Sequence, residues 1–339
     1  MWLTKLREYW ENVLEIFSSG EDEESQSSSG QSRPDVHQQS VGQSSESGQR
    51  PSAGLPATGN KEAHMTKKAL VVGVDKYKNS AWNLEGCTLD AAVMSGMFQD
   101  HFGFPGDNIR LLMDDRATKA KIVEHLDWLV RDSKPGDVLV FFYAGHGSQV
   151  RDRNGDELED AMDEILCPHD LDWDDALTDD ILHSYFKRVP QGANLSIVFD
   201  CCHSGTGTRS LLAPVTPKGE VIGEIEYSKT RYIKPPIDIE HRSRGIALRS
   251  RRVGETIIKE NQVLMAACGS HQEAQEKRFK GQARGAFSFY LGAALKRANW
   301  KMTYREAHEA TLTRMRDHNF IQIPQLEGPD EFLNRQVFS

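Results

Sequence analysis

The fold of this chain is decided by a hydrophobic run that ends in a glycine-flanked histidine: Val138-Leu139-Val140-Phe141-Phe142-Tyr143-Ala144-Gly145-His146-Gly147-Ser148. Its apolar part, Val138–Phe142, predicts a strand of a parallel sheet, because strands buried on both faces are continuously hydrophobic. A second such run, Leu195–Phe199, precedes Asp200-Cys201-Cys202-His203-Ser204-Gly205. Open α/β sheets place their sites at the carboxyl ends of the strands. We therefore expect an imidazole and a thiol to meet at one edge of a sheet.

Strands and helices alternate along the chain from Lys67 onward. The hydrophobic pattern predicts further strands at Ala69–Val74, Ile109–Met113 and Val263–Ala267, with a short edge strand at Ile321–Leu326 that Pro324 interrupts. It predicts helices at Thr88–His101, after Thr118, at about Asp179–Arg188, at Phe287–Ala298 and after a capping box that begins at Thr303. This alternation predicts an α/β fold, in which helices cover both faces of a mostly parallel sheet of about six strands.

Composition divides the chain into three parts. Residues 1–18 predict an amphipathic helix, which could dock on a partner, lie on a membrane surface or pack on its own domain. Residues 19–65 are rich in Ser, Gln and Gly and predict a disordered linker. Residues 66–339 predict one globular domain, with a large part at 66–205, a basic insertion at 206–260 and a small part at 261–339. The insertion has little periodicity and is expected to be a long surface loop.

Charge is unevenly distributed along the domain. Between Asp152 and Asp180 there are thirteen acidic residues and one arginine, whereas between Lys229 and Arg252 there are eight Lys or Arg and two acidic residues. The acidic stretch follows the candidate histidine, so it favours cationic substrates over nucleic acid at that edge of the sheet. The alternative is that both stretches are solvated loops without a binding role.

Cysteine usage and hydropathy indicate the compartment. Five cysteines are an odd number and do not suggest a disulfide framework, so we expect a reducing compartment, the cytoplasm. No run of 18 apolar residues predicts a transmembrane segment. The first 17 residues also lack the basic start and apolar core of a signal peptide.

The chemistry expected at the sheet edge is that of a thiol activated by an imidazole. A free cysteine, with a pKa of ~8.5, is only slightly ionised at neutral pH, and a nearby histidine can take its proton. The glycines beside His146 leave room for a peptide, and the backbone N–H groups of Gly147 and Cys202 are expected to bind an oxyanion. Taken singly, such a cysteine is often an inert core residue, and such a histidine often only caps a turn.

The two motifs together resemble those of metacaspases and their bacterial orthocaspase relatives, which are caspase-like cysteine peptidases. The resemblance also includes Val71–Tyr77, Leu84–Cys87, Asn154–Glu157 and Val263–Gly269. It extends over about residues 66 to 330, which is nearly the whole predicted domain. It implies a caspase-like α/β/α sandwich and a peptidase that cuts after Arg or Lys through an acyl-enzyme.

The resemblance also implies a role for each motif residue. Cys202 corresponds to the nucleophile, His146 to the base and Cys201 to a variable position without a catalytic role. Asp200 corresponds to the carboxylate that pairs with the Lys or Arg before the cleaved bond, although a turn cap is its simpler explanation. Self-cleavage is expected in the basic insertion or in the serine-rich linker. The candidate basic residues in the insertion are Arg209, Lys229, Arg231, Arg249, Arg251 and Arg252.

Calcium as an activator stays open. No cofactor is expected to be required, but many metacaspases are activated by Ca²⁺, and Asp179 and Asp180 match the paired aspartates of that site. Carboxylate oxygens suit this cation. However, the pair follows Thr178 in the first turn of a predicted helix, where acidic residues are favoured without a metal. Arg209 also stands where calcium-binding members carry a further aspartate.

Two other functions compete with that of a peptidase. One is a catalytically inactive caspase-like module that binds partners through its N-terminal helix, but inactive members commonly lack one residue of the Cys–His pair. The other is a small metal site formed by His146, Cys201, Cys202 and His203. Adjacent ligands at one strand end seldom converge on a tetrahedral ion, and the chain has no Cys-x-x-Cys pair.

Overall fold

The computed structural model describes residues 65–151, 162–202, 228–237, 239, 261–269 and 272–339. The predicted N-terminal helix at 1–18 and almost all of the predicted linker at 19–65 lie outside these residues. So do most of the insertion and the candidate cleavage residues Arg209, Arg249, Arg251 and Arg252.

A six-stranded sheet forms the centre of the domain, in the order β12-β9-β7-β3-β1-β2. Its strands are β1 (Lys67–Gly73), β2 (Ile109–Met113), β3 (Val138–Ala144), β7 (Asn194–Asp200), β9 (Gln262–Ala266) and β12 (Gln325–Glu327). Neighbouring strands pair in parallel, except that β12 runs antiparallel to β9 at the edge. The predicted mostly parallel sheet of six strands is confirmed.

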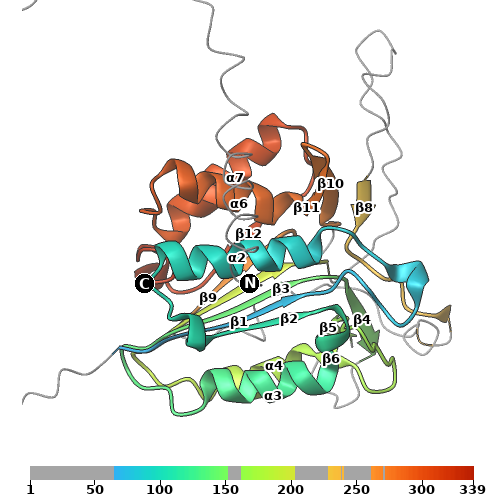
Figure 1. Ribbon diagram of the computed structural model, residues 1–339, viewed down its shortest axis with the longest axis horizontal. Helices are drawn as coiled ribbons and strands as arrows, with labels where there is room; N and C mark the ends of the chain where they lie inside the picture. The colour runs from blue at the N-terminus through green and yellow to red at the C-terminus, as the bar shows by residue number, and fades with distance from the viewer. Residues whose placement is uncertain (1–64, 152–161, 203–227, 238, 240–260, 270–271) are drawn as a thin grey trace, which may run out of the picture.

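Helices cover both faces of this sheet (Figure 1). On one face lie α2 (Cys87–His101), α6 (Ala286–Arg297) and α7 (Tyr304–Asp317), and on the other lie α3 (Lys119–Val130) and α4 (Asp179–Phe186). The shorter elements are α8 (Asp330–Leu333) and the 3-10 helices η1 (Ser80–Trp82), η2 (Gly106–Asn108) and η3 (Asp114–Arg116). Thr118 caps α3, and Thr303 and Glu306 form the predicted capping box of α7, each cap stabilising its helix by about 1 kcal/mol.

Two small antiparallel sheets lie at the end of the central sheet where β3 and β7 finish (Figure 1). The first consists of β4 (Gly147–Arg151), β5 (Met162–Leu166) and β6 (Leu177–Thr178). The second consists of β8 (Ser228–Thr230), β10 (Gln275–Phe279) and β11 (Gln282–Gly285). These strands were not predicted from the sequence, because most are short and carry charged residues that give no apolar pattern.

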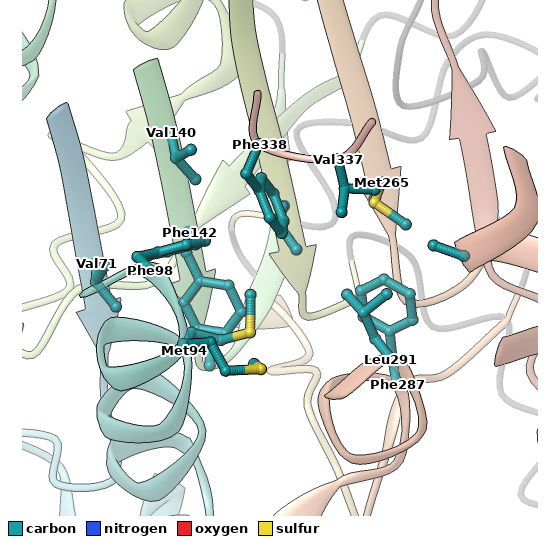
Figure 2. Packing of buried hydrophobic residues seen from close by; sticks show 14 of the residues in the cluster. Val71, Met94, Phe98, Val140, Phe142, Met265, Phe287, Leu291, Val337 and Phe338 are labelled. Carbon is teal, nitrogen blue, oxygen red and sulfur yellow. The ribbon is translucent and has the colours of Figure 1, made fainter. Parts of the chain in front are cut away.

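The core lies on both faces of the central sheet and fixes the ends of β3 and β7. On one face, Phe98 of α2 lies beside Phe142 of β3, and Phe287 of α6 lies near Met265 of β9 (Figure 2). The alternate residues of β3 belong to a second buried cluster on the face of α3 and α4. Each fully buried side chain of this size contributes about 1.5–3 kcal/mol. The two cores therefore hold the carboxyl edge of the sheet in place.

The structure corrects one expectation about the insertion. Its described part, residues 228–237 and 239, is not exposed throughout, since the side chain of Arg231 is completely buried and Ile233 is also buried. The physical reason is that acidic residues inside the domain neutralise the buried guanidinium. All five cysteines are buried thiols. None of the helices in the described ranges is long and apolar enough to cross a membrane.

Candidate active site

The predicted histidine and cysteine follow adjacent, paired strand ends. β3 and β7 run in parallel with Ala144 opposite Asp200, and each predicted residue stands two positions further along the chain. The backbone N–H groups of Gly147 and Cys202 both donate to the carbonyl oxygen of Arg231, each over 3.1 Å. Because the two loops share one acceptor, they meet at one point beyond the sheet edge.

Hydrogen bonds fix the backbone of His146 at both ends. Its N–H donates to the hydroxyl of Tyr77 over 2.8 Å, and its carbonyl oxygen accepts from the N–H of Cys167 over 3.0 Å. The hydroxyl of Tyr143 lies 2.8 Å from the same carbonyl oxygen. The loop therefore holds the imidazole in one position.

One ring nitrogen of His146 is bound and the other is not. Nε2 lies 2.8 Å from the carbonyl oxygen of Trp82. A carbonyl only accepts hydrogen bonds, so Nε2 carries the proton in the neutral ring and Nδ1 holds the lone pair. Nδ1 is buried and has no hydrogen-bond partner among the described residues. This nitrogen is the group that can accept a proton from a thiol.

The environment keeps His146 neutral. Burial is the main effect that lowers the pKa of His146 to about 4, and the positive charges of Arg231 and Lys229 lower it further. The carbonyls of Trp82 and Arg231 act in the opposite direction. An imidazole in this environment is a free base at neutral pH.

The thiol of Cys202 is buried and protonated. Its Sγ atom accepts a hydrogen bond from the N–H of Ala274 and lies 3.5 Å from Sγ of Cys268. Burial and the neighbouring Cys268 raise the pKa of Cys202 well above its usual value. Cys201 belongs to the core on the opposite face of the sheet.

A pocket of three buried carboxylates lies beside the thiol and holds the guanidinium of Arg231. The Nη2 atom of Arg231 lies 2.6 Å from Asp90 and 3.4 Å from Glu276, and its Nη1 atom lies 3.1 Å from Asp200. The side chains of Arg231, Asp90, Asp200 and Glu276 have no exposed surface. Asp200 thus faces a basic side chain, that of Arg231.

The carboxylates of the pocket are fixed by the chain around them. Oδ2 of Asp200 accepts from the N–H of Ser288 in the first turn of α6 over 3.0 Å, so Asp200 is a helix cap as well as an ion-pair partner. Asp90 pairs with Nε of Arg284 over 2.5 Å. Glu276 accepts from two backbone N–H groups that precede α2. Because these groups are already oriented, a guanidinium enters a prepared site.

The two predicted oxyanion donors are occupied. The N–H groups of Gly147 and Cys202 point at one place, as an oxyanion site requires, but that place holds the carbonyl of Arg231. Nothing in the sequence indicates that this chain would itself supply the carbonyl that these two groups bind.

The predicted calcium residues lie at the start of α4. Thr178 caps this helix, and Asp179 and Asp180 form its first turn. Within the described ranges they do not join a third His, Cys, Asp or Glu residue in a group close enough to hold a metal ion. The one such group in that part of the chain is Asp75, Cys87 and Glu276. Asp75 there already accepts hydrogen bonds from Cys87 and Thr88.

Comparisons with known proteins identify the family. A family model described as "Metacaspase, peptidase C14 domain" matches residues 67–209. A Metacaspase-1A of Aspergillus oryzae is 30% identical to this chain over 288 residues, which cover 77% of the chain and 67% of the relative. The chain belongs to the metacaspase family. A Metacaspase-1 of Debaryomyces hansenii is 42% identical over 147 residues, which are 41% of this metacaspase but only 33% of that relative's length.

A solved structure supports the fold of this metacaspase. The crystal structure of a protein from Geobacter sulfurreducens matches it with a TM-score of 0.59 at 23% identity, covering 81% of this chain and 98% of the other. At this identity the likeness shows the shared fold alone.

Sequence reasoning missed most of the residues that complete the metacaspase site. Tyr77 and Trp82 hold His146, and Asp90 and Glu276 complete the carboxylate pocket. Asp90 was hidden because an acidic residue in the first turn of a helix is common without any function. The motif context around Tyr77 and Cys87 was recognised, but it gave no sign of which side chains enter the site.

Proposed function

We propose that this metacaspase is a cysteine endopeptidase that cleaves after Arg or Lys, with Cys202 as nucleophile and His146 as base. The observation that carries the proposal is the position of Arg231. Its side chain fills a pocket of three carboxylates, while its carbonyl oxygen is bound by the N–H groups of Gly147 and Cys202. A peptide with Arg before its scissile bond would place the same two groups in the same two places.

The pocket explains the preference for a cationic side chain. Asp90, Asp200 and Glu276 are buried, and without a guanidinium they would repel one another. A guanidinium offers several donors in a planar fork and can bind more than one carboxylate at once. An aspartate in this pocket would add a fourth negative charge, so we expect aspartyl peptides to be excluded.

The proposed reaction begins with proton transfer. Nδ1 of His146 accepts the proton of the Cys202 thiol, and the sulfur attacks the carbonyl carbon that follows the bound Arg or Lys. The two backbone N–H groups stabilise the negative charge that develops on the carbonyl oxygen, an effect worth about 3–4 kcal/mol when one such donor is removed elsewhere. The imidazolium then protonates the leaving amine, and water hydrolyses the thioester.

Activation by calcium remains a prediction from the family resemblance. The described residues do not complete a calcium site around Asp179 and Asp180, so no step of the proposed reaction depends on the ion. Self-processing after a basic residue and a reducing compartment, the cytoplasm, complete the proposal. The five buried thiols support the reducing compartment.

Short fluorogenic peptides that end in Arg, Lys or Asp test the proposal. After prolonged incubation, with calcium and with a chelator, the wild-type chain should hydrolyse the Arg and Lys peptides and not the Asp peptide. Cys202→Ala is the control and should be inert. Equal rates for wild type and Cys202→Ala would overturn the peptidase assignment in favour of a binding module.

A further inference from the structure

The segment Ser228–Ile233 lies in the candidate active site as an extended strand. Its first three residues, β8, pair antiparallel with β10, with Thr230 opposite Gln275 and Lys229 opposite Glu276. The N–H of Arg231 continues this pairing by donating to the carbonyl of Ala274 over 2.9 Å. Addition of a strand to a sheet edge is a common way for a protein to bind an extended peptide.

The segment leaves the site along the opposite loop. The N–H of Ile233 donates to the carbonyl oxygen of Gly147 over 3.1 Å, and the hydroxyl of Ser148 donates to the carbonyl of Ile233 over 2.6 Å. Backbone contacts therefore hold the segment on both sides of the peptide bond that joins Arg231 to Tyr232. The other basic residue of the segment, Lys229, hydrogen-bonds to the carbonyl oxygen of Asn83 and pairs with Glu85.

Arg231 is oriented as the residue before a cleaved bond. Its carbonyl oxygen accepts a hydrogen bond from the backbone N–H of Cys202. Ala274, whose carbonyl oxygen accepts the N–H of Arg231, also donates its own N–H to the sulfur of Cys202. The carbonyl of Arg231 is also close enough to His146 to raise its pKa. The sulfur, the imidazole and the oxyanion donors thus surround one carbonyl group, and it belongs to Arg231.

We infer that the bond between Arg231 and Tyr232 is the self-cleavage site of this chain, and that the uncut segment blocks the cleft. The inference rests on the proposed peptidase function and names one bond among the basic residues of the insertion. Until the bond is cut, Arg231 occupies the pocket that a substrate's basic residue needs. After the cut, both new chain ends are free to leave.

The proposed step is one hydrolysis within one chain. The thiol proton of Cys202 passes to Nδ1 of His146, and a bond forms between Sγ and the carbonyl carbon of Arg231. The bond from that carbon to the nitrogen of Tyr232 breaks, and His146 gives its proton to the new α-amine. One water molecule then hydrolyses the thioester, which restores the thiol and leaves a carboxylate on Arg231.

Mass spectrometry and N-terminal sequencing of the incubated full-length chain test the inference. We expect a fragment that begins at Tyr232, formed by first-order kinetics at a rate independent of protein concentration. Cys202→Ala should remain intact at this bond. It should also remain intact when it is mixed with active wild type, because its segment lies in its own active site and not in that of a second molecule.

Variants of the segment separate cutting from blocking. Arg231→Ala should reduce the cut at this bond by at least about 30-fold, which corresponds to loss of ~2 kcal/mol from a buried ion pair. Arg231→Lys should still be cut, which guards against a folding defect as the explanation. Lys234→Ala, which changes an exposed basic residue three positions away, is the matched control and should be cut like wild type.

Tyr232→Pro tests the block. It keeps Arg231 in the pocket but replaces the leaving amine by a ring nitrogen, so the chain should stay uncut and hydrolyse added Arg peptides far more slowly than processed wild type. Uncut Tyr232→Pro that matches the wild-type peptide rate would overturn the block.

The outcomes distinguish this inference from the proposed function. If wild type hydrolyses Arg peptides but its new N-terminus is not Tyr232, or if no cut occurs, the inference is wrong and the peptidase assignment stands. If neither wild type nor Arg231→Ala hydrolyses any peptide and no self-cleavage occurs, the proposed function itself fails.

Discussion

The Nε2 atom of His146 lies 2.8 Å from the carbonyl oxygen of Trp82, which fixes the proton on that nitrogen and leaves Nδ1 as the base. This contact and the burial of the ring set the acid–base behaviour of the site. The segment Ser228–Ile233 adds a further effect, because the charges of Arg231 and Lys229 lower the pKa of His146 beyond what burial does.

The pKa of His146 should rise when the segment leaves. In uncut Cys202→Ala, NMR titration of the imidazole should show protonation only near pH 4, because burial disfavours the charged ring. In the processed chain the value should move toward 6.5, since water enters and Arg231 and Lys229 withdraw. Because the folded pKa lies below the unfolded one, His146 lowers the stability of the uncut chain as the pH falls from about 6.5 to about 4. Titration near 6.5 in the uncut chain would contradict this.

Asp200→Asn should weaken selection of arginine while the helix cap stays intact. The amide oxygen can still accept the N–H of Ser288, but it carries no charge for the guanidinium. Loss of one partner of a buried pair commonly costs about 2–5 kcal/mol, so kcat/KM for an Arg peptide should fall at least about 30-fold. Glu85→Gln is the matched control: this acidic residue forms half-exposed pairs with Lys229 and Arg278, and its loss should change kcat/KM less than about fivefold. Similar losses for both variants would count against the pocket.

Gly285→Ala should close the pocket to arginine. A Cβ atom on Gly285 would overlap the carboxylate of Asp200 and the guanidinium of Arg231. Overpacking of this kind costs about 1–3 kcal/mol, so we expect a rise in KM for Arg peptides and slower cutting at Arg231. Gly106→Ala, whose nearest contact would be an ordinary 3.6 Å to Gln99, should leave both rates unchanged. An unchanged KM for Gly285→Ala would show that peptides bind elsewhere.

Tyr77→Phe should slow the reaction without changing specificity. The variant removes the acceptor of the His146 N–H, and a buried donor left without a partner costs about 1–3 kcal/mol. We expect a lower thermal midpoint and a lower kcat, with KM for Arg peptides and the Arg-to-Lys ratio unchanged. Tyr143→Phe is the comparison, since the His146 carbonyl would keep its bond from Cys167 and the effect on kcat should be smaller. A larger loss from Tyr143→Phe would show that the carbonyl side positions the ring.

Elements that are encoded locally could be predicted from the sequence. The runs at β3 and β7 are continuous because both faces are buried, so their pairing and the convergence of His146 and Cys202 followed from pattern alone. The cap at Thr118 and the capping box at Thr303 were equally local.

Apart from Asp200, the members of the pocket could not be predicted, because they have no common pattern. Asp90 comes from a helix, Asp200 from a strand end and Glu276 from a hairpin nearly two hundred residues after Asp90 in sequence. Arg231 was one of six candidate cleavage residues in a segment expected at the surface, since nothing in a polar, aperiodic segment indicates that a guanidinium will be buried. Only the folded chain brings these charges within hydrogen-bonding distance.

The two adjacent thiols of this chain point into cores on opposite faces of the same sheet, as successive residues of a strand do. The alternation of side chains along β7 therefore decides which of the two cysteines faces the cleft. Deleting or inserting one residue between Asn194 and Asp200 would exchange the faces to which the two cysteines point, so that Cys201 would face the cleft in place of Cys202. Alignment gaps in this strand should consequently be rare among active relatives, however freely the loops on either side vary in length.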